Sequence, residues 1–322
     1  MDPCLSSLLK INYPRDKLEV IVVDNGSTDG SVEYIKEKYP WVKLIRLNKN
    51  YGYAIANNVG AKFSKGKFLV FLNNDTAVDK NWLIELIKVA IQNPNVILTS
   101  KALFFHKPDT IEWNGSKITL IARAICPNIG EKDKQLTEKR YTLSPYGASM
   151  LVGKEIFEKL GGFDGDYFIS YEDKDLGLRA WLMGYSVVYV STSVFYHVGG
   201  GTGGRGKYVS DILIFHSVKN SYMNIIKYFD ITHIVLGVIF SLMFNIYFLL
   251  KFATNGRINH AKMITLAHVW LLLNSKNILK KRIVLNYEAK RKRRFLFNDL
   301  FYASFREAFE VFRRKSSLTM FS

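Results

Sequence analysis

Residues 68–76 read Phe-Leu-Val-Phe-Leu-Asn-Asn-Asp-Thr, five apolar side chains followed at once by three polar ones. A continuous apolar run of this length predicts a strand that is buried on both faces, as in a sheet covered by helices. In open α/β sheets, ligands bind beyond the carboxyl ends of the strands, so the polar triplet stands where a metal or a hydroxyl group would be bound. The same residue types are also common in plain turns, where Asn and Asp side chains bond to their own backbone.

Strand and helix patterns alternate on both sides of this stretch. The spacing of apolar residues predicts strands and helices in turn at residues 19–23, 31–38, 42–46, 53–63, 68–72 and 79–92. This repetition predicts a parallel sheet that is covered by helices and joined by right-handed crossovers. Residues 101–146 contain several Pro and Gly residues and predict loops and short strands, which would suit a flap over a site.

The composition is that of a globular protein with a strong positive charge. With 322 residues, 48% of them hydrophobic, the chain forms either two domains or one large domain with an appendage. A formal charge of +17 favours anionic partners, for which nucleotide phosphates, nucleic acid and acidic lipids all qualify. Two cysteines suggest neither a disulfide framework nor a zinc site, and the N-terminal residues do not resemble a signal peptide. A reducing, cytoplasmic setting fits best.

Long apolar helices are predicted after residue 211. Residues 234–250 contain only Ser241 and Asn245 as strongly polar residues, and these two form a stripe with Gly237 at four-residue spacing. The run is marginal for a membrane span, which needs roughly 20 apolar residues.

Basic clusters at residues 280–282 and 290–294 follow these helices. An aromatic stripe of the kind found in helices that lie in a membrane interface comes next, made by Phe297, Phe301, Phe305, Phe309 and Phe312. A solvated charge run and an ordinary aromatic core are the alternative interpretations. We predict attachment to the cytoplasmic face of the cell membrane, with peripheral binding favoured over spanning.

Five motifs follow one another along the chain: VVDNGSTDG at residues 22–30, NYGYAIANNVG at 50–60, FLNNDT at 71–76, GGFD at 161–164 and EDKDLGLR at 172–179. In this order they resemble family 2 glycosyltransferases, especially their rhamnosyltransferase-like branch, over roughly residues 4 to 230. The resemblance implies a GT-A fold, a nucleotide-diphospho-sugar donor and inversion of the anomeric carbon.

The resemblance also implies how the chain is organised. Residues 1–215 would form an α/β GT-A catalytic domain with a mostly parallel central sheet, and residues 216–322 a helical, apolar and basic region that associates with the membrane. Family members usually begin with an additional strand that forms a wall of the nucleotide site. We expect this strand to be missing here, because Met1 falls inside what should be the following helix.

Donor and metal binding are assigned by the resemblance position by position. It implies that Asp24 contacts the nucleobase or ribose, and that Asp75 ends the family's Asp-X-Asp metal triplet, which begins here with Asn73. His197 resembles the histidine that completes the metal site, and its imidazole suits Mn²⁺ better than Mg²⁺. The cation would neutralise the diphosphate of the leaving nucleotide. Contacts to the nucleotide-sugar are implied for Asn50, Asn58, Asn73, Asn74, Ser149, Arg205 and Lys207.

The catalytic residues are assigned in the same way. Asp173 matches the base that takes the proton from the acceptor hydroxyl in an inverting displacement. We expect the neighbouring Glu172 to raise the proton affinity of Asp173 by like-charge repulsion, and Glu172 or Asp175 to hold the acceptor or the donor sugar. The Gly-rich residues 199–207 would close over the donor, with Arg205 and Lys207 near its phosphates.

The sequence therefore predicts a metal-dependent, inverting hexosyl- or deoxyhexosyltransferase that acts on a glycan or a lipid-linked acceptor. Two alternatives remain open. The first is a non-catalytic protein that binds a membrane or nucleic acid through its basic C-terminal region, although no nucleic-acid-binding module is evident and we expect no nucleic-acid partner. The second is a degenerate glycosyltransferase that is inactive without its first strand. The donor sugar, the linkage and the oligomeric state are not predicted.

Overall fold

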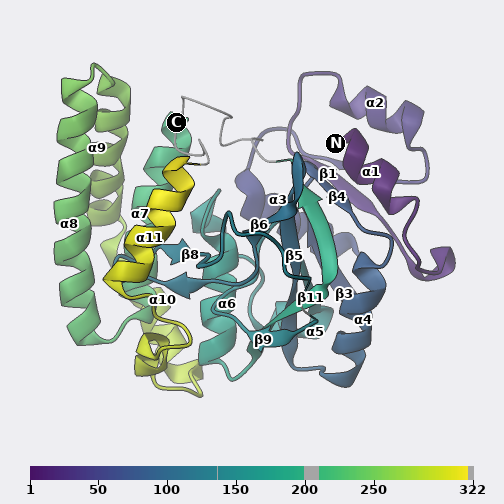
Figure 1. Ribbon diagram of the computed structural model, residues 1–322. Coiled ribbons are helices and arrows are strands. Elements are labelled where there is room, and N and C mark those ends of the chain that lie inside the picture. Colours follow the sequence, from purple (N-terminus) through teal and green to yellow (C-terminus); the bar gives the residue numbers. More distant parts are fainter. Residues whose placement is uncertain (136, 199–209, 318–322) are drawn as a thin grey trace.

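The central sheet has seven strands in the computed structural model, which describes residues 1–135, 137–198 and 210–317 (Figure 1). Its main path runs through β3 (Phe68–Leu72), β10 (Ser149–Gly153), β5 (Val96–Phe104), β11 (Ser186–His197) and β4 (Thr76–Val78). Two strands lie off this path: β6 (Lys107–Trp113) pairs with β5, and β9 (Lys139–Tyr141) pairs with β11. A further small hairpin joins β7 (Lys117–Ile118) and β8 (Ala124–Ile125).

This sheet is mixed, where the sequence predicted a mostly parallel one. β5 and β11 pair in parallel, while β10 runs antiparallel to both β3 and β5, and β4 runs antiparallel to β11. Parallel neighbours need a crossover of a dozen or more residues, usually a helix. β4 follows β3 after a three-residue turn and β10 follows a loop, so counting helical crossovers in the sequence could not reveal the direction of either strand.

The N-terminal part alternates strand and helix as predicted. It comprises α1 (Asp2–Leu8), a short 3₁₀ turn (Arg15–Lys17), β1 (Ile21–Asp24), α2 (Ser31–Lys38), β2 (Lys43–Arg46) and α3 (Gly52–Phe63). β1 and β2 pair in parallel with each other in a separate two-stranded sheet. Within the described residues, no strand pairs with the other edge of β1 or of β3.

β3 is covered on both of its faces, as its apolar run predicted. Leu69 and Phe71 are 5% exposed and pack into a core with α3, α5 (Lys154–Lys159) and α6 (Glu172–Leu182). Phe68, Val70 and Leu72 point to the opposite core, which α1, α2 and α4 (Trp82–Gln92) cover. Figure 1 shows these two groups of helices on either side of the sheet. The turn after β3 is therefore held at a fixed place on the edge of the sheet.

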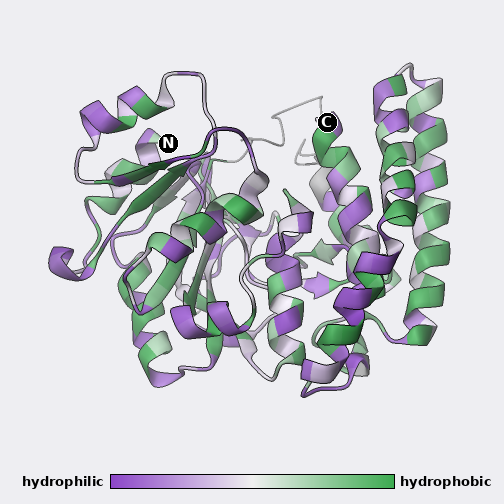
Figure 2. Cartoon of the chain, turned by 180° about the vertical axis from the view of Figure 1, so that it is seen from behind, coloured by the Kyte–Doolittle hydropathy of each residue, from purple (hydrophilic) through white to green (hydrophobic). Residues whose placement is uncertain are grey.

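The C-terminal part is helical. It contains α7 (Asp211–Tyr228), α8 (Ile231–Thr254), α9 (Ile258–Leu273), α10 (Ser275–Glu288), η3 (Arg293–Phe297) and α11 (Phe305–Ser317). Ile225, Tyr228 and Phe229, at the end of α7, enter the core beside α6. α8 and α9 lie side by side at the edge farthest from α1 and α2 (Figure 1), and both are predominantly hydrophobic (Figure 2). By length and composition, α8 alone among the helices of the described part could cross a membrane.

The predicted aromatic stripe does not lie on one helix. Phe297 ends η3, and Phe301 is buried against Trp181 with 4.7 Å between ring centroids. Three members of the stripe remain exposed on α11, namely Phe305, Phe309 and Phe312. The four-residue spacing of these phenylalanines thus continued across a break between two helical segments, which the sequence pattern did not reveal.

Candidate active site

Asp75 and His197 are brought together by the pairing of β4 with β11. Asp75 precedes β4, and His197, the last residue of β11, pairs with Thr76, the first residue of β4. The two side chains meet with 3.3 Å between His197 Nε2 and Asp75 Oδ1, and they are 11% and 22% exposed. The two residues that the resemblance assigned to a metal therefore lie side by side at the end of the sheet.

Glu112, on β6, holds the other side of the His197 ring. Its carboxylate lies 2.8 and 2.9 Å from His197 Nδ1, and the Tyr146 hydroxyl donates to the same carboxylate at 3.3 Å. Burial disfavours the imidazolium, but the hydrogen bonds and charges of Asp75 and Glu112 outweigh it and raise the pKa of His197 to about 10. Glu112 could not be predicted from the sequence, because it lies in residues 101–146, where no periodic pattern of apolar residues is evident.

The arrangement of Asp75 and His197 fits a divalent cation. A carboxylate oxygen and an imidazole nitrogen 3.3 Å apart are close enough to bind one ion. Metal-binding histidines usually donate their second ring nitrogen to a carboxylate, as Nδ1 does here to Glu112. No group of three or more His, Cys, Asp and Glu side chains among the described residues could hold a metal. Asp75 and His197 are thus the two side chains of the described part that would hold a cation at this place.

The turn that carries Asp75 is fixed by its backbone. The Asn73 N–H donates to the carbonyl of Ala148 at 3.1 Å, and its carbonyl accepts from the Thr76 hydroxyl at 2.7 Å. The side chain of Asn73 is half-buried and that of Asn74 is exposed. Ordinary turn hydrogen bonds and a candidate ligand thus occur in the same triplet.

Asp173 lies at the start of α6 and is held from two sides. Its Oδ2 accepts a hydrogen bond from the N–H of Gly147 at 2.7 Å, and the Lys174 ammonium lies 2.9 Å from the same carboxylate. A Cβ atom at Gly147 would lie 3.2 Å from Asp173 Oδ2, so a side chain there would crowd the carboxylate. Asp173 is 3% exposed. Its orientation is therefore fixed by the neighbouring backbone.

Glu172 is also buried, with 7% exposed, and no hydrogen bond to its Oε2 occurs within the described residues. Burial and the charge of Asp173 raise the pKa of Glu172 to about 8. The like-charge effect predicted for this pair is thus seen on Glu172, which stays protonated near neutral pH.

Two half-buried tyrosines, Tyr53 and Tyr146, lie between His197 and the start of α6. Tyr53 donates to the carbonyl of Gly147 at 2.7 Å, and Tyr146 stands edge-on to His197 with 5.8 Å between ring centroids. Burial raises the pKa of both phenols, and the charges of Asp75 and Asp173 raise both further. Gly147 binds the Asp173 carboxylate and directly follows Tyr146, whose ring stands against His197, so Asp75, His197 and Asp173 lie near one another.

Asp24 and Asn50 lie at the end of β1 and at the start of α3. Asp24 Oδ1 accepts from the Ser27 N–H at 3.1 Å, whereas Oδ2 has no hydrogen-bond partner among the described residues. Asn25, which the sequence did not single out, donates to Asn50 Oδ1 at 2.9 Å. The Gly52 N–H donates to the same oxygen at 2.9 Å. The side-chain oxygen of Asn50 is therefore engaged within the protein, while Asp24 Oδ2 is buried and lies 4.0 Å from Arg46 Nε.

Three of the predicted site residues have structural partners instead of an open face. Asn58 exchanges two hydrogen bonds with the backbone of Phe163, at 2.8 and 2.9 Å, and so holds the GGFD turn. Ser149 is fully buried in the sheet and accepts from Trp82 Nε1 at 2.8 Å. Asp175 is fully buried and ion-paired. We therefore assign these three side chains a structural role, in place of the predicted contact with the sugar nucleotide. Arg205 and Lys207 lie outside the described residues.

Comparisons with known proteins place the chain in a family. The family model described as glycosyl transferase family 2 matches residues 1–161. The O-antigen biosynthesis protein RfbC of Myxococcus xanthus is 31% identical over 202 residues, which are 60% of this chain and 16% of that protein. The chain thus spans only a small part of the length of that relative.

Two solved structures show the same architecture. GalNAc-T7 with UDP, GalNAc and Mn²⁺ superposes with a TM-score of 0.57 and 19% identity, over 71% of this chain and 45% of that one. The mannosyltransferase PcManGT from Pyrobaculum calidifontis, in complex with GDP-Man and Mn²⁺, superposes with a TM-score of 0.50 and 18% identity. This superposition covers 89% of this chain and 81% of that one. At these identities the likeness concerns the fold alone, which is the GT-A fold.

Proposed function

The chain belongs to glycosyl transferase family 2 and is a glycosyltransferase with a GT-A fold, and from this premise we propose that it transfers a hexosyl or deoxyhexosyl group from a nucleotide-diphospho-sugar to an acceptor hydroxyl, with inversion. The similar structures with UDP and with GDP-Man support the donor class. Two observations support the proposal: Asp75 contacts His197, and Gly147, which binds Asp173, directly follows the Tyr146 that stands against His197.

Asp173 is the proposed base. In an inverting displacement, one carboxylate takes the proton of the acceptor hydroxyl on the face of the sugar opposite the leaving diphosphate. The hydrogen bonds from Gly147 and Lys174 hold the Asp173 carboxylate in one orientation, as a positioned base requires. Glu172, protonated near neutral pH, adds no second negative charge beside it. The proton would move to the Asp173 carboxylate as the acceptor oxygen attacks the anomeric carbon.

Asp75 and His197 would hold a divalent cation, and the Mn²⁺ present with the two similar proteins supports this choice. When bound, the cation supplies positive charge that stabilises the diphosphate leaving group. Glu112 keeps the His197 ring in place, and Asp24 Oδ2 would accept a hydrogen bond from the nucleoside. For the acceptor we propose a glycan or a lipid-linked glycan, since RfbC is named for O-antigen biosynthesis.

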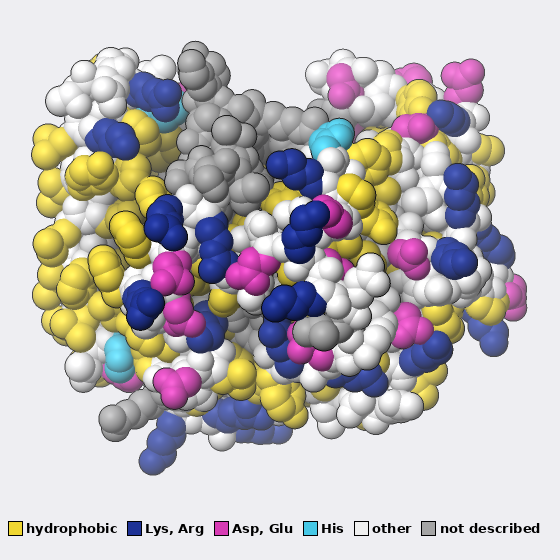
Figure 3. All heavy atoms as spheres, viewed as in Figure 1, with side chains coloured by type: hydrophobic (Ala, Val, Ile, Leu, Met, Phe, Trp, Pro, Cys, Tyr) yellow, Lys and Arg dark blue, Asp and Glu magenta, His cyan; other side chains and the backbone are white. Residues whose placement is uncertain are grey.

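Contact with a membrane is the second part of the proposal. α8 is polar inside and apolar outside: Gly237, Ser241 and Asn245 face the protein, whereas Met243 and Ile246 are 62% and 56% exposed. Figure 3 shows the hydrophobic side chains gathered over α8 and α9. Outward apolar faces of this kind suit lipid and not water. Since the inner face of α8 packs on α7, peripheral attachment on the cytoplasmic side is proposed. Failure to bind neutral phosphatidylcholine vesicles would contradict it.

The decisive experiment is Asp173→Asn. We expect transfer to fall by roughly 10²- to 10⁴-fold, which is the usual contribution of a positioned base. Calorimetry with a panel of UDP-, GDP- and dTDP-sugars should show donor binding unchanged by the substitution. Asp109→Asn, which removes an exposed carboxylate, is the matched control. Transfer by the Asp173→Asn protein at more than a tenth of the wild-type rate would exclude Asp173 as the base.

A further inference from the structure

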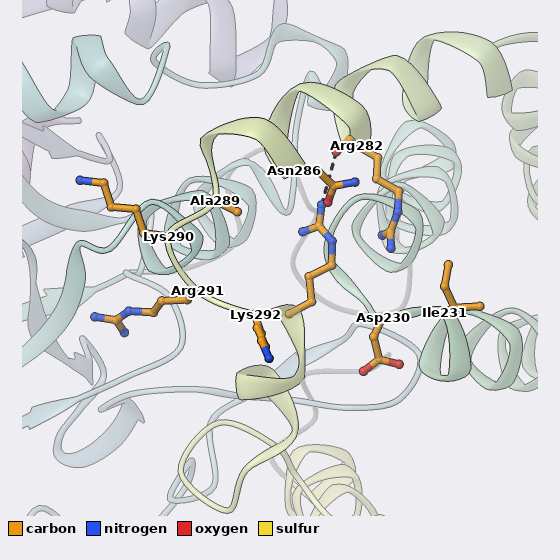
Figure 4. A pocket seen from close by; sticks show the side chains of 9 residues that line it. Asp230, Ile231, Arg282, Asn286, Ala289, Lys290, Arg291 and Lys292 are labelled. Atoms are coloured by element: carbon orange, nitrogen blue, oxygen red, sulfur yellow. Dashed lines mark hydrogen bonds between the residues drawn. The ribbon is translucent and has the colours of Figure 1, made fainter.

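A strongly basic cavity lies at the junction of α8, α10 and η3. Its volume is about 450 Å³, and its lining includes Arg282, Asn286, Lys290, Arg291, Lys292 and Arg293. Figure 4 shows Arg282, Asn286 and Lys292 around its centre, while the side chains of Lys290 and Arg291 extend to one side. One acidic residue, Asp230, lines the same cavity.

Arg293 is the buried member of this group. It is 9% exposed, and its Nε and Nη1 atoms have no hydrogen-bond partner among the described residues. Its Nη2 donates to the Arg282 carbonyl at 3.4 Å. Burial and the charge of Arg282 lower the pKa of Arg293 to about 10. A buried guanidinium with unused donors beside a second one is unfavourable unless an anion accepts from it.

The neighbouring groups do not supply that anion. The Asp230 carboxylate accepts from His233 Nδ1 at 2.7 Å and from the His233 N–H at 3.1 Å, where it begins α8. Arg282 donates to the carbonyls of Ile226 and Phe229, both at 2.7 Å, and so is fixed against the end of α7. The positions of both guanidiniums are therefore set by the fold, and Arg293 retains unused donors.

We propose that this cavity binds a phosphate group, and that the phosphate is the headgroup of an anionic membrane lipid. Guanidinium donors match phosphate oxygens in pairs, and the charge-assisted hydrogen bonds they form are about twice as strong as neutral ones. The site does not depend on glycosyl transfer. Only its lipid source rests on the membrane contact proposed above.

The position of the cavity at the start of α8 points to a lipid. Ile231, the first residue of α8, lines the cavity and is 70% exposed. From there the exposed apolar face of α8 continues through Val235, Ile239 and Met243, which are 53%, 47% and 62% exposed. A phosphate in the cavity would leave attached acyl chains next to this face. A free phosphate would contact only the basic residues of the cavity and not the apolar face of α8.

The test compares two substitutions that each make the chain more negative by one unit. Asn286→Asp places a carboxylate at the cavity from an exposed position, so the fold should survive. Lys280→Gln removes an exposed cation from the same helix and lies outside the lining. Co-sedimentation of the full chain with phosphatidylcholine vesicles, with and without phosphatidic acid, measures lipid binding. Calorimetry with inorganic phosphate measures the free anion.

We expect phosphatidic acid to strengthen the binding of the wild-type protein to vesicles. Asn286→Asp should reduce this increase in binding about tenfold, and Lys280→Gln should change it by less than about twofold. Arg293→Gln should act like Asn286→Asp where it folds. An equal loss in Asn286→Asp and Lys280→Gln, or no gain from phosphatidic acid together with no phosphate binding, would overturn the site. Phosphate binding that Asn286→Asp abolishes, without any preference for phosphatidic acid, would overturn the lipid source and leave free phosphate as the ligand.

Discussion

The first turn of α6 carries two aspartates with opposite environments, Asp173 and Asp175. Asp173 accepts from a backbone N–H and lies among the residues of the candidate site. Asp175 is fully buried on the other side of the helix, where Arg179, Lys227 and the Tyr228 hydroxyl bind its carboxylate. Within one motif, Asp173 is thus the candidate for catalysis and Asp175 has a structural role. Asp175 is bound by three side chains of the core, whereas Asp173 is bound by a backbone N–H and by the neighbouring, partly exposed Lys174.

The cations around Asp175 come from the C-terminal helices. Lys227, on α7, binds both Asp175 and Asp164, the last residue of the GGFD motif, at 2.9 Å in the latter case. Lys281, on α10, lies 2.6 Å from Asp164 and from Asp166. Burial alone would raise the pKa of Asp164, but these lysines hold it well below its usual range. The helical region therefore fixes the helix that carries Asp173.

We expect a large loss of stability when the buried ion pair of Asp175 is broken. Lys227→Met removes a 2% exposed ammonium and leaves Asp175 and Asp164 without one of their cations. Breaking a buried ion pair in this way typically costs about 3–5 kcal/mol. Urea unfolding followed by circular dichroism should show that loss in the free energy of unfolding. Lys276→Met, at an exposed position on α10, is the control and should change stability by less than about 0.5 kcal/mol.

If Lys227→Met unfolds like wild type, Asp175 does not depend on the helical region. We expect Asp173→Asn, in the same assay, to lose clearly less stability than Lys227→Met while losing transfer activity. The two aspartates would then differ in the property that each substitution removes.

The second effect concerns Glu112, which positions His197 on the site-facing side. Glu112→Ala should weaken Mn²⁺ binding about 10- to 100-fold, the usual range for a residue that orients a metal ligand. Glu112→Gln retains an acceptor for His197 Nδ1 and should lose less. Calorimetric titration of Mn²⁺ into the purified protein measures both, with the 88% exposed side chain of Glu155 replaced by Gln as control. Unchanged Mn²⁺ affinity in Glu112→Ala would remove His197 from the metal site.

Sequence patterns predicted the parts of the site that are local. The apolar run before Asn73 and the order of the motifs predicted where Asp75, Asp173 and His197 would stand along the strands and helices. Glu112 could not be predicted in this way, because β6 joins β5 with two register shifts that hide its period. The pairing of Asp175 with Lys227 joins residues 52 positions apart, so no local pattern contains it. Contacts of this range appear only when the helical region is packed against α6.

Glu172 should also make the stability of the fold depend on pH. The pKa of Glu172 is raised from 4.5 to about 8 in the folded protein, so the folded state binds more protons than the unfolded state between these values. Stability must then fall as pH rises through this window, by at most about 1.4 kcal/mol per pH unit. The raised pKa of His197 acts in the same direction above pH 6.5.

Glu172→Gln removes the contribution of Glu172 and leaves that of His197. The stability of the variant relative to wild type should increase by about 1 kcal/mol or more between pH 5 and pH 7.5, because over this range Glu172 loses its proton readily in the unfolded state only. Urea unfolding at both pH values measures the difference, and Glu155→Gln, at an exposed site, should show none. Parallel stability curves for Glu172→Gln and wild type would mean that Glu172 titrates normally. The charge of Asp173 would then be balanced by other groups, and both acids of the pair would be ionised at the site.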